Sequence, residues 1–357
     1  MSIQRHLLEW FDKNQRPLPW RKNYEPYHVW ISEVMLQQTQ MKTVLPYFER
    51  WTALFPDVKT LASSDLKQVL KAWEGLGYYS RARNLHESAK HIVDKHRGVF
   101  PEDFDAILAL KGIGRYSAGA IASIAFNQER PIVDGNILRV LSRLHAIDKP
   151  IDVEKNKPLF WRLEEKMIPK GKARWFNQAL MELGALVCTP DNPACAVCPL
   201  KKFCRAYKIG SPQNYPVKAK KNKSVKITAG ALVLENKGRY LIRFRPLGEI
   251  MGGLWEFPEW KLAKNKSMTA KAVESKTARL IKKELAQPAG KLEYLGPIKR
   301  SYTYFNETLH VFSGRTESAS EAAGAWESAW VTKKDFSKYP FSSAHAKIVA
   351  LIQEISK

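Results

Sequence analysis

The spacing of hydrophobic residues divides the chain into two unlike halves. From residue 1 to 187, apolar residues recur three or four positions apart, as in Leu66, Val69, Leu70 and Trp73. This spacing is typical of helices that bury one face. The segments are joined by short connectors, and none of them alternates as a half-buried strand does. We therefore predict that the N-terminal half is all-α.

After residue 226 the pattern changes. Residues 227–245 read as two strands joined by an Asn-Lys-Gly turn at 236–238. A helical stretch over Ser275–Glu284 and a last helix that begins at Ser343 follow. The pattern predicts an α+β C-terminal domain over residues 227–357.

A basic segment lies between the two halves. Pro212 and Pro216 interrupt regular structure, and residues 217–226 then contain five lysines and no acid. We interpret 209–226 as a linker that runs along a phosphate backbone, which leaves 1–208 as the helical domain. A linker that only improves solubility is the alternative.

Composition narrows the class of protein. The chain has 357 residues, of which 45% are hydrophobic and 11% aromatic, and this excludes a fully disordered chain. No apolar run is long enough to span a membrane, and the N-terminus lacks a signal-peptide core. We expect a cytoplasmic monomer without a membrane partner.

The charge points to a polyanionic partner. Lysine and arginine number 58 against 35 acidic residues, which gives a formal net charge of +23. Residues 201–250 carry +11 of it, whereas residues 1–200 carry +6. Nucleic acid is the first partner to consider for such a chain.

The cysteines indicate one metal site. All four lie within seventeen residues, as Cys188, Cys195, Cys198 and Cys204. A reduced intracellular chain does not favour disulfides, and a zinc ribbon usually has two Cys-x2-Cys pairs where this loop has one. Four thiolates also suit an iron–sulfur cluster, although the spacing differs from that of ferredoxins.

Residues 110–121 predict a phosphate-binding turn. Gly112 and Gly114 lie between one helix and the next, where backbone N–H groups and a helix N-terminus can bind phosphate without a side chain in the way. This is the pattern of a helix–hairpin–helix motif, which grips the DNA backbone without reading bases. Lys111 adds a positive charge beside it. A plain helix-joining turn is the alternative.

Two carboxylates are candidates for acid and charge-stabilising roles. Glu33 lies among Ile31, Val34 and Met35, so it is either on a solvent face or in an apolar cleft that would raise its pKa. Asp134 begins an amphipathic helix, where an N-cap is the ordinary role. A protonated and an ionised carboxyl together suit the cleavage of a glycosidic bond, and a nucleotide's base–sugar bond is glycosidic.

Three segments and the cysteine spacing together resemble a known family. These are residues 33–40, 75–85 and 133–136, and the likeness covers nearly the whole chain. The chain resembles the MutY family of adenine DNA glycosylases, within the helix–hairpin–helix, iron–sulfur superfamily. The resemblance implies a [4Fe-4S] cluster on the four cysteines and double-stranded DNA with A:8-oxoguanine or A:G mispairs as substrate. A flipped adenine would lie between two helical subdomains.

The resemblance also implies roles for residues. Glu33 would protonate the adenine ring, and Asp134 would stabilise the sugar cation, with Tyr116 and Asn136 supporting that aspartate. Residues that match the adenine pocket and the DNA wedge are Arg21, Gln38, Thr39 and Tyr78.

Tyr116 separates this chain from its near relatives. Endonuclease III-like members have a nucleophilic lysine at this position, and a phenol cannot form a Schiff base. We therefore expect a monofunctional glycosylase. A bifunctional glycosylase/lyase for oxidised pyrimidines and a non-catalytic DNA-binding module are the alternatives.

The C-terminal domain resembles the Nudix fold, which raises nucleotide pyrophosphatase activity as a further possibility. That chemistry needs carboxylates on a helix to hold magnesium, and residues 274–284 have lysines there instead. We expect a recognition module. The family's Phe-Ser-His triplet for 8-oxoguanine is replaced by Tyr304, Phe305 and Asn306, or by residues 302–304 if the register shifts by two.

Overall fold

The structure is a computed structural model that describes residues 2–219, 224–285, 289–302, 304–317 and 327–354. The chain forms two compact units. The first consists of Met1–Ser64 and Asn84–Lys221, and the second of Asp65–Arg83 and Asn222–Lys357. The segment 65–83, which the sequence pattern groups with the helical half, is thus assigned to the same unit as the C-terminal half.

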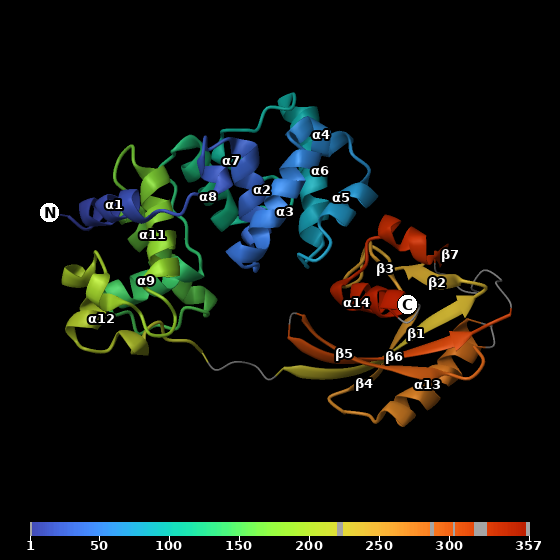
Figure 1. Cartoon of the computed structure of the whole chain (residues 1–357). Helices are drawn as coiled ribbons and strands as arrows, with labels where there is room; N and C mark the ends of the chain where they lie inside the picture. The colour runs from blue at the N-terminus through green and yellow to red at the C-terminus, as the bar shows by residue number, and fades with distance from the viewer. Residues whose placement is uncertain (1, 220–223, 286–288, 303, 318–326, 355–357) are drawn as a thin grey trace. The chain divides into compact units, whose positions relative to one another are not determined.

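The first unit is helical (Figure 1). Its long helices are α1 (Ile3–Asn14), α2 (Pro26–Leu36), α3 (Met41–Leu54), α6 (Ser80–His96), which begins in the second unit, α8 (Arg115–Phe126), α9 (Gly135–His145), α10 (Lys157–Met167) and α11 (Ala173–Leu186). Short helices are α4 (Val58–Ser63), α7 (Phe104–Leu108) and α12 (Arg205–Lys208). Single 3₁₀ turns are η1 (Pro19–Arg21), η2 (Glu154–Asn156), η3 (Cys195–Val197), η4 (Lys201–Phe203) and η5 (Pro212–Asn214).

Helix α8 lies at the centre of this unit because its residues are small. Ser117 to Ala125 are all buried, so neighbouring segments can approach the helix closely. A Cβ at Gly119 would lie 2.4 Å from the carbonyl oxygen of Pro131. This close approach holds the segment that leads to Asp134 against α8.

The second unit is built on a seven-stranded mixed sheet. Its strands are β1 (Val225–Asn236), β2 (Arg239–Phe244), β3 (Trp255–Glu256), β4 (Glu259–Lys264), β5 (Glu293–Tyr302), β6 (Phe305–Arg315) and β7 (Ser328–Thr332). The order is β3-β2-β1-β6-β5, with β4 paired to β1 and β7 to β2. Strands β1 and β6 run parallel, and the other pairs are antiparallel. The remaining elements are α5 (Leu66–Ala72), α13 (Ala270–Glu284), η6 (Lys333–Lys338) and α14 (Ser343–Glu354).

Both faces of the sheet are covered, and the pleat of β1 explains how. Ala231 and Val233 point into the cluster that includes α14, whereas Leu232 and Leu234 point into the cluster that includes α13. A Cβ at Gly230 would lie 2.2 Å from Oγ1 of Thr277 on α13, so a glycine is needed where this helix crosses the strand. Figure 1 shows α13 and α14 beside the sheet.

The structure confirms the predicted fold class. The N-terminal half is helical, β1 and β2 pair around residues 236–239 as the turn predicted, and helices occupy the regions expected after 275 and 343. Among the helices in the described ranges, none combines the length and apolarity needed to cross a bilayer.

Candidate active site

A cavity of about 650 Å³ opens in the helical unit. Its walls come from η1, α2, the loop after α2, and helices α8, α9 and α11. Four residues that the sequence singled out for chemistry line it together: Glu33, Tyr116, Asp134 and Asn136. The fold therefore brings together side chains that are about one hundred positions apart in the sequence.

Glu33 lies on the buried face of α2 and is 5% exposed. The pKa of Glu33 is raised to about 7, chiefly by burial and also by the negative charge of Asp134, while the hydrogen bond from Tyr116 and the positive charge of Arg21 act in the opposite direction. The Tyr116 hydroxyl lies 3.0 Å from Oε2 of Glu33 and donates to it. The solvent-face alternative for Glu33 is thus excluded. Tyr116 supports this glutamate, whereas the sequence suggested that it supports Asp134.

Asp134 is the N-cap of α9. Its Oδ1 accepts from the amide of Ile137 at 2.7 Å, and its Oδ2 accepts from Nδ2 of Asn136 at 2.8 Å. Burial raises the pKa of Asp134, and both hydrogen bonds lower it. Asp134 therefore caps α9 and also lines the cavity.

Asn136 is fixed from the other side by Arg139. Nη2 of Arg139 donates to Oδ1 of Asn136 at 2.9 Å and to the carbonyl of Gly184 at 2.7 Å. Nε of Arg139 donates to the carbonyl of Cys188 at 2.7 Å. A continuous set of hydrogen bonds thus joins the cysteine loop to Asp134.

The cavity wall also contains an ion-pair network around Glu182. Arg16 forms two bonds to its carboxylate, at 2.7 and 2.9 Å, and Nη2 of Arg21 lies 3.0 Å from Oε2. Burial opposes ionisation of Glu182, but the hydrogen bonds from the two arginines lower its pKa to about 2. The other Arg21 nitrogens donate to Gln178 and to the carbonyl of Arg16, so the donors of this predicted pocket residue are engaged within the protein.

Sequence reasoning did not identify Arg16, Gln178 or Glu182. Glu182 is 166 positions from Arg16, and nothing local marks either residue. The one available signal was an acidic residue on the buried face of a predicted helix, which requires a cationic partner.

The loop after α2 reaches the rim of the cavity. Gln38 has a left-handed backbone (φ 56) and an exposed side chain, and both Gln38 and Thr39 line the cavity. The side chain of Gln37 donates to Oγ of Ser117 at 3.0 Å and ties this loop to α8. Gln38 thus presents an exposed polar side chain at the cavity.

The predicted glycine turn joins α7 to α8. Gly112 has φ 79, and a Cβ there would lie 2.4 Å from Nδ2 of Asn84, so both conformation and space require glycine. Gly114 is the N-cap of α8 and has no side chain to cap the first N–H groups of that helix. Lys111 is exposed and forms an ion pair with Glu87. It does not line the cavity.

The four cysteines line one small cavity beside Arg143. The pKa of the Cys198 thiol is raised to about 12, chiefly by burial and also by the neighbouring cysteines. Four sulfurs so placed need a cationic group before they can be thiolates together, and a metal cluster meets that need. Arg143 organises the loop through bonds to Thr189 at 2.6 Å and to Pro190 at 2.9 Å.

The remaining DNA-contact candidates, Tyr78, Tyr304, Phe305 and Asn306, lie in the second unit. Strands β5 and β6 form the predicted hairpin, in which Tyr302 pairs with Phe305. Tyr304 at the tip is 62% exposed, and Asn306 is exposed and bonded to Ser224 and Ser301. Thr303, part of the alternative triplet, lies outside the described residues. Tyr78 is 46% exposed in a left-handed conformation.

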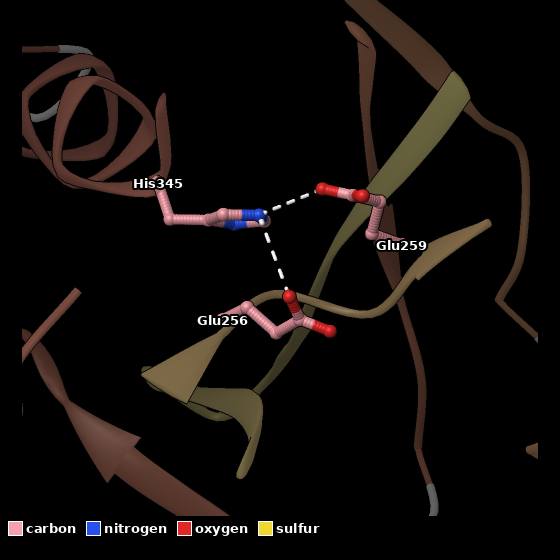
Figure 2. Close-up of side chains that lie close together, drawn as sticks. All are labelled: Glu256, Glu259 and His345. Atoms are coloured by element: carbon pink, nitrogen blue, oxygen red, sulfur yellow. Dashed lines mark hydrogen bonds and ion pairs between the residues drawn. The ribbon is translucent and has the colours of Figure 1, made fainter. Parts of the chain in front are cut away.

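Three metal-ligand side chains meet in the second unit: Glu256, Glu259 and His345 (Figure 2). Arg243 pairs with Glu256 at 2.6 Å, and Arg300 pairs with Glu259 at 2.7 Å. The amide of Phe257 donates to Nδ1 of His345 at 3.1 Å, so Nε2 bears the proton and donates to Glu259 at 3.0 Å.

Glu256, Glu259 and His345 therefore form an ionic network in which arginines balance the charge of the two carboxylates. His345 presents a proton rather than a lone pair to the carboxylates, and arginines already supply the positive charge that a metal would bring. Helix α13 carries lysines 276, 282 and 283, the residues on which we base the expectation that this domain does not bind magnesium as a Nudix hydrolase does.

Comparison with known proteins agrees with this architecture. The family described as HhH-GPD superfamily base excision DNA repair protein matches residues 31–165, and the NUDIX domain family matches residues 229–351. The solved structure of a thermostable thymine-DNA glycosylase is similar to the helical part, with a TM-score of 0.53 and 28% identity over 57% of this chain and 94% of that one. Fold and cavity thus define a helix–hairpin–helix DNA glycosylase class with a Nudix-like second domain.

Relatives that match most of the chain identify the family within this class. The adenine DNA glycosylase of Mus musculus is 33% identical across 99% of this chain and 78% of its own length. That of Buchnera aphidicola (Acyrthosiphon pisum) is 39% identical across 71% of this chain and 73% of its own length. The chain belongs to the adenine DNA glycosylase family.

Proposed function

We propose that this protein excises adenine from A:8-oxoguanine and A:G mispairs in double-stranded DNA by hydrolysing the N-glycosidic bond. The observation that carries the proposal is the single cavity in which the buried, protonatable Glu33 lies with the capped carboxylate of Asp134. One group can donate a proton and the other can stabilise positive charge, as cleavage of this bond requires.

Glu33 acts as the general acid. With a pKa of about 7, it is substantially protonated at neutral pH and gives up its proton readily. Transfer of that proton to a ring nitrogen of adenine makes the base a neutral leaving group. Tyr116 holds Oε2 of Glu33 in place and so fixes the direction of transfer.

Asp134 stabilises the sugar as the base departs. Burial raises the pKa of Asp134, but its position at the N-terminus of α9 and its bonds from Ile137 and Asn136 act against that effect and favour the ionised form that an oxocarbenium-like sugar needs nearby. Electrostatic stabilisation, or a transient bond from its carboxylate to the sugar carbon, then precedes attack by water.

The reaction is monofunctional. Tyr116 occupies the position at which lyases have lysine, and Lys111 points to Glu87 rather than into the cavity. We expect single-turnover incubation with an A:8-oxoguanine duplex to give abasic product that breaks only after alkali. An absence of abasic product would refute the proposal, and strand breaks without alkali would favour the bifunctional alternative.

Cys188, Cys195, Cys198 and Cys204 line one small cavity and would hold a [4Fe-4S] cluster. When bound, such a cluster ties four points of the loop together. The loop also carries Lys201 and Lys202 on η4. These lysines would then contact DNA phosphates in fixed positions, since a rigid loop loses little entropy on binding.

Cys198→Ser is expected to lower the iron content and to flatten the salt dependence of DNA binding. Losing one or two phosphate contacts reduces the slope of log K against log salt by about 1 to 2. Val197→Ser is the matched control, because Val197 is 70% exposed in the same loop and has no ligand atom. An unchanged slope in an iron-depleted Cys198→Ser protein would contradict the phosphate role.

The hairpin of the second unit reads the base opposite adenine. Tyr304 and Phe305 offer rings at the β5–β6 tip, with centroids 4.3 Å apart, and Asn306 offers an amide. Aromatic stacking and one hydrogen-bonding side chain suffice to contact a purine edge. The basic segment 209–226, in which Val217 and Ala219 are hydrogen-bonded to Ile151 and Asp152 and Val225 begins β1, would follow the phosphate backbone.

A further inference from the structure

The turn at residues 75–79 joins α5 to α6 and has an unfavourable backbone. Gly75 and Gly77 have φ values of 101 and 70, and Tyr78 has φ 47 although it is not glycine. A bulky residue in this region costs about 1 kcal/mol or more, and it persists only where the surroundings impose it. The side chain that this conformation presents, Tyr78, is 46% exposed.

Part of the constraint comes from within the segment. Nε1 of Trp73 donates to the carbonyl of Gly77 at 3.0 Å. Nη2 of Arg81 donates to the carbonyls of Leu76 and Gly77 at 3.0 and 3.1 Å. The guanidinium of Arg81 also lies 5.7 Å from the centre of the Tyr78 ring. These bonds close the turn from within the segment.

The C-terminal half of the same unit fixes both ends through Phe341. The hydroxyl of Tyr79 accepts from the amide of Gly75 at 3.3 Å and donates to the carbonyl of Phe341 at 2.9 Å. The amide of Phe341 in turn donates to Oε1 of Glu74 at 2.8 Å. Phe341 therefore contacts Glu74, just before the turn, through its amide and Tyr79, at the end of the turn, through its carbonyl.

Two further hydrogen bonds join segment 65–83 to the C-terminal half of the same unit. Nζ of Lys71 donates to the carbonyl of Tyr339 at 3.2 Å, and Arg83 donates to the carbonyl of Gly252. A Cβ at Gly253 would lie 3.3 Å from Nη1 of Arg83, so a glycine permits this close approach. The contacts thus run from α5 through the turn into α6.

Segment 339–341 also contacts strand β3. The amide of Trp255 on β3 donates to the carbonyl of Pro340 at 2.8 Å, and Trp255 forms a parallel bridge with Phe341. The rings of Trp255 and Tyr339 lie 4.9 Å apart, edge to face. Segment 339–341 is therefore attached to the sheet and can transmit its position to the turn.

We propose that segment 339–341 of the C-terminal domain holds the 75–79 turn in its left-handed conformation and thereby presents Tyr78 to duplex DNA. Tyr79 and Glu74 are then positioning residues. The C-terminal domain acts on DNA binding through the turn as well as through its own hairpin. The DNA contact of Tyr78 rests on the proposed function, whereas the hold on the turn does not.

Hydrogen exchange of the full-length protein without DNA tests the hold. Tyr79→Phe removes the hydroxyl that joins Gly75 to Phe341, and we expect the amides of residues 74–79 to exchange about fivefold faster, as loss of one hydrogen bond implies. Tyr294→Phe is the matched control, because it removes a hydroxyl bonded to His310 at 2.9 Å elsewhere in the same domain. Unchanged exchange in Tyr79→Phe would overturn the proposal.

Glu74 offers an independent pair of variants. Glu74→Gln keeps an oxygen that accepts from the Phe341 amide, so exchange in the turn should stay within about twofold of wild type. Glu74→Ala removes that acceptor and should accelerate exchange as Tyr79→Phe does. Equal effects of the glutamine and alanine variants would count against the hydrogen bond as the cause.

A double-mutant cycle tests the link to DNA. The probe is a duplex with an uncleavable abasic-site analogue opposite 8-oxoguanine, and Tyr79→Phe should raise its Kd about fivefold. On a Tyr78→Ala background, Tyr79→Phe should add less than about twofold, because the side chain that it positions is gone. An unchanged Kd, or a full fivefold effect on that background, would overturn the proposal even if the protein excises adenine as proposed.

Discussion

Glu33→Gln is expected to lower the single-turnover rate of adenine excision by about 10²- to 10⁴-fold, which is the usual contribution of a general acid. Glutamine keeps the shape of the side chain and an oxygen that accepts from the Tyr116 hydroxyl, whose bond to Glu33 is 3.0 Å long. It has no proton of suitable acidity for the adenine ring. Binding of the substrate duplex should therefore stay within a few-fold of wild type while excision is lost.

The pH dependence gives the same test a second readout. Because burial raises the pKa of Glu33 to about 7, the protonated form is lost as the pH rises through 7, and the wild-type rate should fall with it. The residual rate of Glu33→Gln should show no such decline. A glutamine variant that retains more than about a tenth of the wild-type rate would exclude Glu33 as the acid.

Stability provides the control for folding. A carboxyl whose folded-state pKa lies above its unfolded value stabilises the fold fully at low pH, and this contribution is lost as the pH rises towards the folded pKa. Glutamine does not ionise. Glu33→Gln should therefore match wild type in urea at pH 4 and exceed it at pH 8, by on the order of 1–3 kcal/mol. A loss of activity with a gain in stability cannot be attributed to misfolding.

Local sequence predicted the parts of this site that have local causes. Apolar neighbours on both sides of Glu33 left two possibilities, a solvent face or an apolar cleft, and the structure shows the second, with Glu33 5% exposed. The residue order Asp-Gly-Asn before an amphipathic run indicated an N-cap at Asp134, and the structure has it. In each case the residues that determine the environment lie within one helical turn.

Features that depend on distant partners could not be predicted in this way. Periodicity shows which face of a helix is buried but not which residue it meets, so the bond from Tyr116 to Glu33 and the pairing of Arg16 with Glu182 were invisible. For the same reason, the assignment of segment 65–83 to the second unit could not be predicted from the sequence. Its apolar spacing is helical like that of its neighbours, and the polar contacts to Phe341 have no counterpart in the local sequence.

The second large effect is expected for Asp134→Asn, which should reduce excision by about 10²- to 10³-fold or more, because the sugar cation loses its nearest negative charge. The cap on α9 survives in part, since an amide oxygen can still accept from Ile137, now bonded at 2.7 Å. The new amide nitrogen, however, faces the nitrogen of Asn136, which cannot flip because its oxygen accepts from Arg139 at 2.9 Å. Two donors in contact should cost about 1–2 kcal/mol of stability.

The exchange of Asp134→Asn with Asn136→Asp separates charge from hydrogen bonding. In the double variant the amide at position 134 donates to the carboxylate at position 136, which also accepts from Arg139. Unfolding by urea should show that the stability lost in Asp134→Asn returns, while excision stays at the level of the single variant. If excision returned to within about tenfold of wild type, a negative charge at position 134 would not be required. If neither property returned, the 2.8 Å bond between these side chains would not be what Asp134→Asn disrupts. Recovery of stability without activity would assign the chemistry to the carboxylate and the fold to its hydrogen bonds.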